Sequence, residues 1–179
     1  ARDALHLLGV DARHARAVAG SDTREVRVMA DDNDAEIAGR WNLLLSGASR
    51  STVPARSAER IIVDLGNYYC AYPQLTTTAG KGAFVRISWA ESLFNSPDAK
   101  SDHRKNSDSK GNRDEIEGKY FVGVGDVFRP DGGVRREFRP LWWMSGRYVE
   151  IVVQTADEAL VVEDLLFFET RYPLELESR

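Results

Sequence analysis

Val85-Arg86-Ile87-Ser88-Trp89 alternates apolar and polar side chains without interruption, and this pattern decides the fold class. Successive side chains of a β-strand point to opposite faces of the sheet, so the stretch places Val85, Ile87 and Trp89 on one face. Arg86 and Ser88 lie on the other. We therefore expect a strand in the middle of a sheet that has one face in solvent.

The same alternation recurs on both sides of this strand. Residues 147–154 place Val149, Ile151 and Val153 inward, and residues 160–172 form a last strand before Pro173. Further apolar runs that predict strands are residues 24–30, 40–46, 59–65, 67–72, 119–128 and 134–138. The turn sequence Pro130-Asp131-Gly132-Gly133 predicts a hairpin between the last two runs. About nine strands without a useful amphipathic helix predict an all-β fold, an antiparallel β-sandwich of jelly-roll type.

The chain divides into an N-terminal arm or linker at residues 1–23 and a β-sandwich domain at residues 24–179. Within the domain, residues 96–118 contain only Ala99 and Ile116 as apolar side chains. We expect a long polar loop there, and such loops are often functional.

Composition narrows the classes of function. A formal net charge of -4 over 179 residues gives no basic surface for nucleic acid, and no apolar run approaches the length of a membrane span. No cofactor is predicted. The acidic residues Asp32, Asp34 and Glu36 have calcium-loop spacing, but Ile37 and Leu43 stand where such a loop needs glycine and a carboxylate. Turn formation is the favoured reading, and a structural calcium held by loop carboxylates stays open. The compartment is not predicted.

Five motifs in fixed order resemble the bacterial α-L-rhamnosidases of glycoside hydrolase family seventy-eight. They are Asp64-Leu65-Gly66, Trp89-Ala90-Glu91-Ser92-Leu93, Asn112-Arg113-Asp114, Gly146-Arg147-Tyr148-Val149 and Arg171-Tyr172-Pro173. The resemblance covers roughly residues 40 to 175. It implies a β-sandwich placed just ahead of an (α/α)6 catalytic barrel of the same polypeptide.

The resemblance also implies where catalysis takes place. Family members are inverting hydrolases whose acid and base are carboxylates on the barrel, which would follow Arg179. Inversion needs two carboxyl groups roughly 6.5 to 9.5 Å apart, and the present residues identify no such pair. Glu91 is a conceivable buried acid with a raised pKa. The favoured interpretation of this strand-end glutamate is that it caps the backbone or forms an ion pair with Arg86 or Arg147.

The aromatic residues permit two interpretations. Trp142, Trp143 and Tyr148, together with Trp89, could stack on a sugar ring or fill the core. Trp142 and Trp143, as neighbours on a strand, are expected to point to opposite faces, one into the core with Trp89 and one to the surface. There the exposed indole would meet the barrel or a sugar.

The prediction is a non-catalytic β-sandwich domain of an α-L-rhamnosidase-like glycoside hydrolase. The loop that ends in Asn112-Arg113-Asp114 is the candidate for reaching toward the mouth of the barrel. The alternative is an independent carbohydrate-binding module that recognises rhamnose-containing glycans.

Overall fold

The computed structural model of this chain describes residues 5–7, 15–18, 34–96 and 110–170. Its one helix there is α1 (Ala35–Leu45). The strands are β1 (Leu5–Leu7), β2 (Ala15–Val18), β3 (Ser51–Val53), β4 (Ala58–Ala79), β5 (Phe84–Ala90), β6 (Val124–Phe128), β7 (Arg136–Phe138), β8 (Met144–Gln154) and β9 (Leu160–Thr170). All their pairings are antiparallel, which confirms the predicted all-β sandwich.

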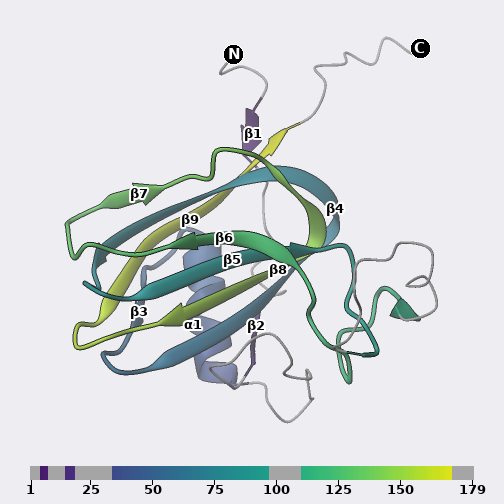
Figure 1. The fold of residues 1–179 in the computed structure, drawn as a ribbon, viewed down its shortest axis with the longest axis horizontal. Helices are drawn as coiled ribbons and strands as arrows, with labels where there is room; N and C mark the ends of the chain where they lie inside the picture. The colour runs from purple at the N-terminus through teal and green to yellow at the C-terminus, as the bar shows by residue number, and fades with distance from the viewer. Residues whose placement is uncertain (1–4, 8–14, 19–33, 97–109, 171–179) are drawn as a thin grey trace.

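Strand β4 connects the layers of the sandwich (Figure 1). Its first half pairs with β2 and β8, and its second half pairs with β9 and β7. Between the halves the register shifts at Asp64 and Tyr69, where Gly66 has a φ of 74°. A β-bulge bends a strand in this way, and glycine takes a positive φ without strain. The sheet order β1-β9-β4-β8-β5-β6 therefore folds over at this corner.

The core lies between the folded layers. Val85, Ile87 and Trp89 of β5 are buried together, as the alternation predicted. The ring of Trp89 meets Phe167 of β9 edge to face, with centroids 5.6 Å apart. Each fully buried Val, Leu, Ile or Phe side chain stabilises the fold by roughly 1.5–3 kcal/mol. The layers are thus joined by direct packing of β5 against β9.

The opposite face of β5 and β8 is also covered, so the predicted solvent-exposed face is wrong for their central residues. Ser88, Tyr148 and Glu150 are all buried. A second apolar cluster forms there from Ile62, Ala90, Leu93, Phe121 and Tyr148. Leu93 and Phe121 belong to the long connection between β5 and β6, and they cover this face of the sheet. The polar composition of residues 96–118 gave no sign that the connection packs on the sheet.

Residues 40–46, predicted as a strand, form the later part of helix α1 and its C-cap Ser46. The carboxylate of Asp34 accepts hydrogen bonds from the backbone N–H groups of Glu36 and Ile37 and caps the helix. Ala38, Trp41 and Leu44 then recur at helical spacing and are buried. Figure 1 shows the helix behind the strands, and its inward face is part of the main core.

Two other predicted strand features differ from the structure. Residues 59–65 and 67–72 are parts of the single strand β4. Within residues 119–128 only β6 is a strand, and β7 pairs with β4 rather than with β6, so the predicted hairpin is wrong. β6 pairs with β5 instead. β6 and β7 are not hydrogen-bonded to each other, but the rings of Phe128 at the end of β6 and Phe138 at the end of β7 stack with centroids 5.2 Å apart.

Part of the predicted N-terminal arm belongs to the sheet, because β1 pairs with β9 and β2 pairs with β4. The strand predicted at residues 24–30, residues 97–109 of the polar loop and the motif Arg171-Tyr172-Pro173 lie outside the described residues. The domain division stays a prediction. Within the described ranges, the single helix is too short to cross a membrane.

Candidate functional site

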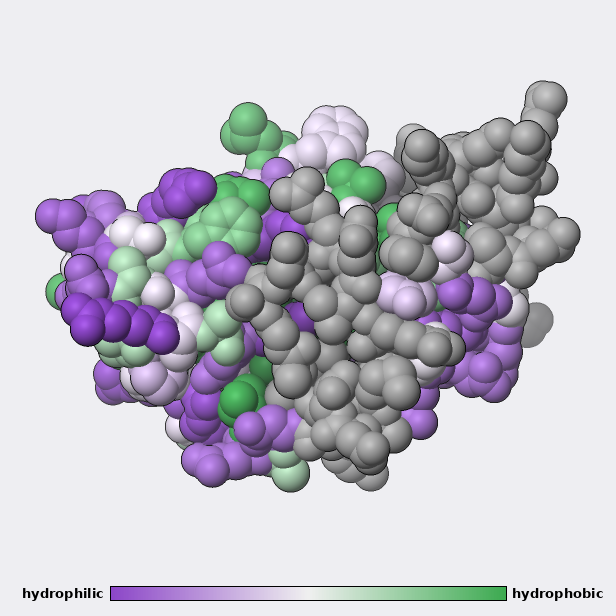
Figure 2. Space-filling view, turned by 60° about the horizontal axis from the view of Figure 1, so that its bottom comes forward, coloured by the Kyte–Doolittle hydropathy of each residue, from purple (hydrophilic) through white to green (hydrophobic). Residues whose placement is uncertain are grey.

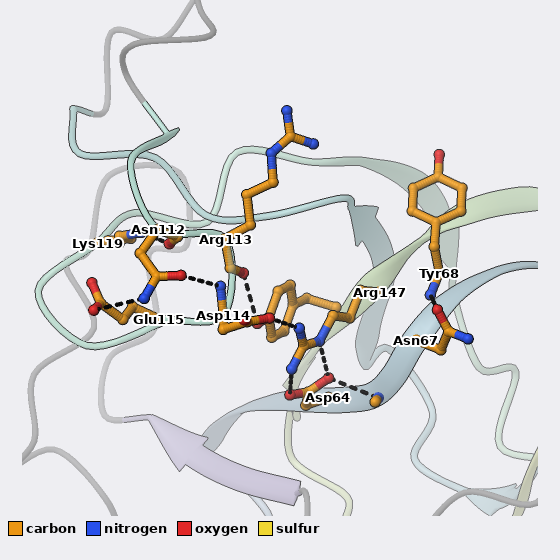
Figure 3. Close-up of polar contacts among 11 residues, drawn as sticks. Asp64, Asn67, Tyr68, Asn112, Arg113, Asp114, Glu115, Lys119 and Arg147 are labelled. Atoms are coloured by element: carbon orange, nitrogen blue, oxygen red, sulfur yellow. Dashed lines mark hydrogen bonds and ion pairs between the residues drawn. The ribbon is translucent and has the colours of Figure 1, made fainter.

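An arginine and two carboxylates meet where β4 bends (Figure 3). Arg147 donates from Nε to Asp64 Oδ1 at 2.8 Å and from Nη2 to Asp64 Oδ2 at 2.9 Å. Its Nη1 also bonds to the carboxylate of Asp114. We call Asp64, Asp114 and Arg147 the Arg147 cluster. It ties the β4 corner, strand β8 and the 110–119 segment together.

The local structure explains the position of this cluster. Asp64 is paired across the β4–β8 ladder with Tyr148, the residue that follows Arg147 in β8, and the ladder shifts its register just after Asp64. The backbone N–H of Gly66 donates to Asp64 Oδ1 at 2.8 Å and fixes that carboxylate. Hydrogen bonds to Asp64 raise the pKa of Arg147 above its usual value, and the bonds to Asp114 add to the effect. Arg147 is therefore permanently charged.

The 110–119 segment is held on the sandwich by further hydrogen bonds. Tyr148 donates its hydroxyl proton to the backbone oxygen of Arg113 at 3.0 Å. Lys119 Nζ donates to the backbone oxygen of Lys110 at 2.7 Å and to that of Asn112. Asn112 in turn donates to Glu115 Oε1 at 2.9 Å (Figure 3). The motif Asn112-Arg113-Asp114 is thus folded onto the sheet.

Glu91 bonds to two cations of the same segment. It accepts from Lys110 Nζ at 2.8 Å and from Arg113 Nη1. The predicted partners are wrong, since Arg86 bonds to Glu150 and Arg147 belongs to the Arg147 cluster. The hydrogen bond from Lys110 lowers the pKa of Glu91, which outweighs burial. The conceivable raised pKa is therefore wrong as well, and Glu91 is an ionised ion-pair partner.

Tyr148 is buried and does not offer a ring to a ligand. Its ring packs in the second apolar cluster, and the guanidinium of Arg147 lies over it at 5.1 Å from the centroid. Burial raises the pKa of Tyr148 to about 12, and the charge of Asp64 adds to this shift. The residue positions the 110–119 segment through its hydroxyl group.

Trp142 and Trp143 lie between β7 and β8 rather than on a strand. Their rings stack on each other, with centroids 6.1 Å apart and planes inclined by 29°. The expectation that they point to opposite faces is wrong, because the chain makes a bend there. Trp142 is 68% exposed, and the preceding Leu141 is fully exposed. Trp89, by contrast, is in the core as predicted.

Three polar residues are hydrogen-bonded to one another, and two of them precede the tryptophan pair closely in the sequence. Gln74 of β4 donates from Nε2 to Glu137 Oε2 at 3.0 Å and accepts from the guanidinium of Arg139. That guanidinium lies over the ring of Phe168, 5.0 Å from its centroid. We call Gln74, Glu137 and Arg139 the Gln74 triad. The sequence did not indicate it, because its members approach only through the β4–β7 pairing.

The predicted site residues form two groups in space. One group is Glu91, Asn112, Arg113, Asp114 and Tyr148, and the other is Trp142 with Trp143. Sequence reasoning missed Asp64, Lys110 and Lys119 as members of the first group. Asp64 and Arg147 both stood in motifs singled out above, and opposite charges in paired motifs were the available signal.

Metal binding has no support from the described part of the chain, where no three His, Cys, Asp or Glu side chains gather. Asp34, one of the acidic residues weighed for calcium, caps α1. Asp32 lies outside the described residues. A structural calcium stays a prediction.

No protein-family model and no curated protein matches the chain. Among solved structures, a rhamnosidase from Klebsiella oxytoca with rhamnose bound is similar with a TM-score of 0.50 and 13% identity, over 93% of this chain and 29% of that one. A mutant of chitosan-binding module 1 from a Paenibacillus sp. IK-5 chitosanase/glucanase has a TM-score of 0.50 and 12% identity, over 92% of this chain and 98% of that one. The family seventy-eight rhamnosidase of Bacillus sp. GL1 has a TM-score of 0.47 and 11% identity, over 70% and 11%.

At these identities the likeness is one of fold. The chain spans under a third of either rhamnosidase and nearly the whole of the chitosan-binding module. It therefore has the β-sandwich architecture found both in carbohydrate-binding modules and in parts of glycoside hydrolases.

Proposed function

We propose that this chain is a non-catalytic β-sandwich domain of an α-L-rhamnosidase-like glycoside hydrolase and that it supports an (α/α)6 catalytic barrel of the same polypeptide. The observation that carries the proposal is the attachment of the 110–119 segment to the sandwich by Tyr148 and the Arg147 cluster. A polar segment fixed in this way gives a neighbouring domain a defined surface.

The contacts of the carboxylates in this region favour a supporting role of the domain over a catalytic one. A glycosidase needs a carboxylic acid that holds a proton near neutral pH. The hydrogen bond from Lys110 lowers the pKa of Glu91, and Asp64 and Asp114 both form ion pairs with Arg147. These carboxylates act as ion-pair partners rather than as a general acid.

Part of the segment faces solvent while its backbone is held. The side chains of Arg113 and Asp114 are 55% and 75% exposed. Each keeps hydrogen-bonding capacity for a partner domain in addition to the bonds within the sandwich. Arg113 and Asp114 are thus the residues through which we expect the barrel to be contacted.

The test uses the full polypeptide with Arg113 and Asp114 both replaced by alanine. We expect lower rhamnoside hydrolysis or a lower melting temperature of the barrel, because the supporting surface is lost. The control is Arg56→Ala with Asp157→Ala, an exposed pair whose side chains are 79% and 86% accessible. Unchanged hydrolysis and unchanged melting in the Arg113 and Asp114 variant would contradict the proposal.

The second candidate is an independent carbohydrate-binding module for rhamnose-containing glycans. The exposed stacked pair Trp142 and Trp143 favours it, since flat aromatic rings suit the apolar face of a sugar. Calorimetric titration of this chain with rhamnose and pectic oligosaccharides separates the candidates. Saturable binding would favour the carbohydrate-binding module. A titration without measurable heat of binding would favour the domain that supports the barrel.

A further inference from the structure

The connection between β7 and β8 brings the tryptophan pair to a defined place. β7 pairs with Leu75–Thr77 of β4, whereas β8 begins opposite Ala71 of the same strand. Residues 139–143 must therefore run beside the intervening β4 residues, which include Gln74. Trp142 and Trp143 therefore follow Arg139 of the Gln74 triad by three and four residues, in the connection that passes this stretch of β4.

The tryptophan pair offers a small flat apolar surface. The stacked indoles hold each other in place, and Trp142 is largely exposed. Nearby, the hydroxyl of the half-exposed Tyr68 donates to Ser145 Oγ at 3.0 Å. Figure 3 shows the Tyr68 ring directed away from the Arg147 cluster. Aromatic side chains commonly line the binding sites of small ligands.

The size and surroundings of this surface suit a small ligand. Its exposed apolar part consists of Leu141, Trp142 and the nearby Tyr68, whereas a stable protein interface buries about 800 Å² on each partner. On the hydrophobicity-coloured surface of Figure 2, apolar residues likewise form separate small areas among hydrophilic ones on the face shown. A sugar ring needs only one aromatic face and a few polar groups.

The polar groups have a balanced charge. Gln74 bridges the carboxylate of Glu137 and the guanidinium of Arg139, so one negative and one positive group are fixed side by side. A guanidinium has five N–H donors and a carboxylate has several acceptor positions, which suits the mixed donors and acceptors of neighbouring sugar hydroxyls. Because the two charges balance, the triad has no net charge with which to attract an anionic or a cationic sugar.

We infer that Trp142, Trp143 and the Gln74 triad form a binding site for an uncharged pyranose residue of a glycan. The inference rests on the carbohydrate-binding role proposed as the second candidate, and it adds the location and the charge class of the ligand. The ring stacks on Trp142, and its hydroxyl groups bond to the triad.

The experiment follows the indole N–H signals of the chain by NMR during titration. The uncharged probes are methyl α-L-rhamnopyranoside and cellobiose, and the charged probes are galacturonic acid and glucosamine. Trp41 and Trp89 are buried and serve as internal references. We expect an uncharged probe to shift the signals of Trp142 and Trp143 saturably and the charged probes to have weaker effects.

Three variants locate the site. Trp142→Ala is expected to weaken binding roughly threefold to tenfold, the loss of one aromatic contact. Gln74→Ala is expected to weaken it as well. Val124→Ala, at an exposed apolar residue of β6 outside the proposed site, is expected to leave it unchanged. Thermal melting checks that each variant is folded.

Each contrary result has a distinct meaning. If no probe binds, both this inference and the binding-module candidate are overturned, while the supporting-domain proposal is unaffected. If a probe binds equally well to Trp142→Ala, only the location is overturned. Equal binding of the charged probes would overturn the assignment of an uncharged ligand.

Discussion

Arg147 binds Asp64 through two parallel hydrogen bonds of 2.8 and 2.9 Å, and the two residues are 83 positions apart in the chain. This bidentate geometry is stronger and more directional than a single ion-pair contact. It joins β8 to the corner at which β4 passes from one layer to the other. Arg147 also bonds to Asp114, so the same side chain holds the 110–119 segment on the sandwich.

Replacing Asp64 with asparagine is expected to lower the free energy of unfolding by about 1–3 kcal/mol, since hydrogen bonds to a charged group are lost. Both side chains are about a quarter exposed or less, so solvent screens the pair only in part. Urea unfolding of Asp64→Asn, Arg147→Gln and the double variant measures the coupling. Additive effects of the two substitutions would show that the pair contributes nothing of its own.

The buried carboxylate of Glu150 offers a sharper stability test. It accepts from Arg60 Nε at 2.6 Å and from Arg86 Nη2 at 2.9 Å on the covered face of β8. Glu150→Gln removes the buried negative charge that both arginines bind and is expected to cost about 3–5 kcal/mol. The control Asp157→Asn, in an exposed ion pair with Arg56, is expected to cost under about 1 kcal/mol. Similar losses in the two variants would contradict the buried placement.

Two glycines are predicted to respond to alanine in opposite directions. A Cβ on Gly146 would lie 2.6 Å from the backbone oxygen of Ala90, so Gly146→Ala forces β8 and β5 apart and is expected to cost about 1–3 kcal/mol. A Cβ on Gly39 in α1 meets nothing within 4 Å. Gly39→Ala is expected to stabilise by about 0.5–1 kcal/mol. The melting temperatures of both variants test these expectations. A higher melting temperature for Gly146→Ala would contradict the register of β8 against β5.

The raised pKa of Tyr148 predicts that the folded state loses stability at alkaline pH. This pKa is raised from 10.0 to about 12, so the folded state keeps the phenol proton that the unfolded state releases. This contribution is complete below pH 10.0 and is lost as the pH rises to about 12. Spectroscopic titration is expected to show one late tyrosine that is absent in Tyr148→Phe. Ionisation of all tyrosines together near pH 10 would contradict the burial of Tyr148.

The parts of the fold that could be predicted from the sequence are those set by interactions between residues close together in the chain. The strands around Val85–Trp89 and Val149–Val153 followed from alternation, because burial on one face imposes a period of two. Helix α1 was missed because residues 40–46 were considered without Asp34, whose cap begins the helix. The pairing of β7 with β4 depends on contacts over sixty residues along the chain, as between Gln74 and Glu137, which no local pattern contains.

The candidate site was predictable only in part for the same reason. Asn112, Arg113, Asp114 and Glu91 were selected from their motifs, and the structure brings them together. The ion-pair partners expected for Glu91 were wrong, because a carboxylate can pair with any cation that the fold brings near it. Trp142 and Trp143 were placed on a strand, whereas a bend stacks their rings.

The central claim is that this chain supports a rhamnosidase-like barrel without performing catalysis. The most direct measurement is hydrolysis of an aryl α-L-rhamnoside by this chain alone and by the full polypeptide that contains it. The account predicts turnover by the full polypeptide and none by the chain. Turnover by the chain alone, or none by the full polypeptide, would contradict it.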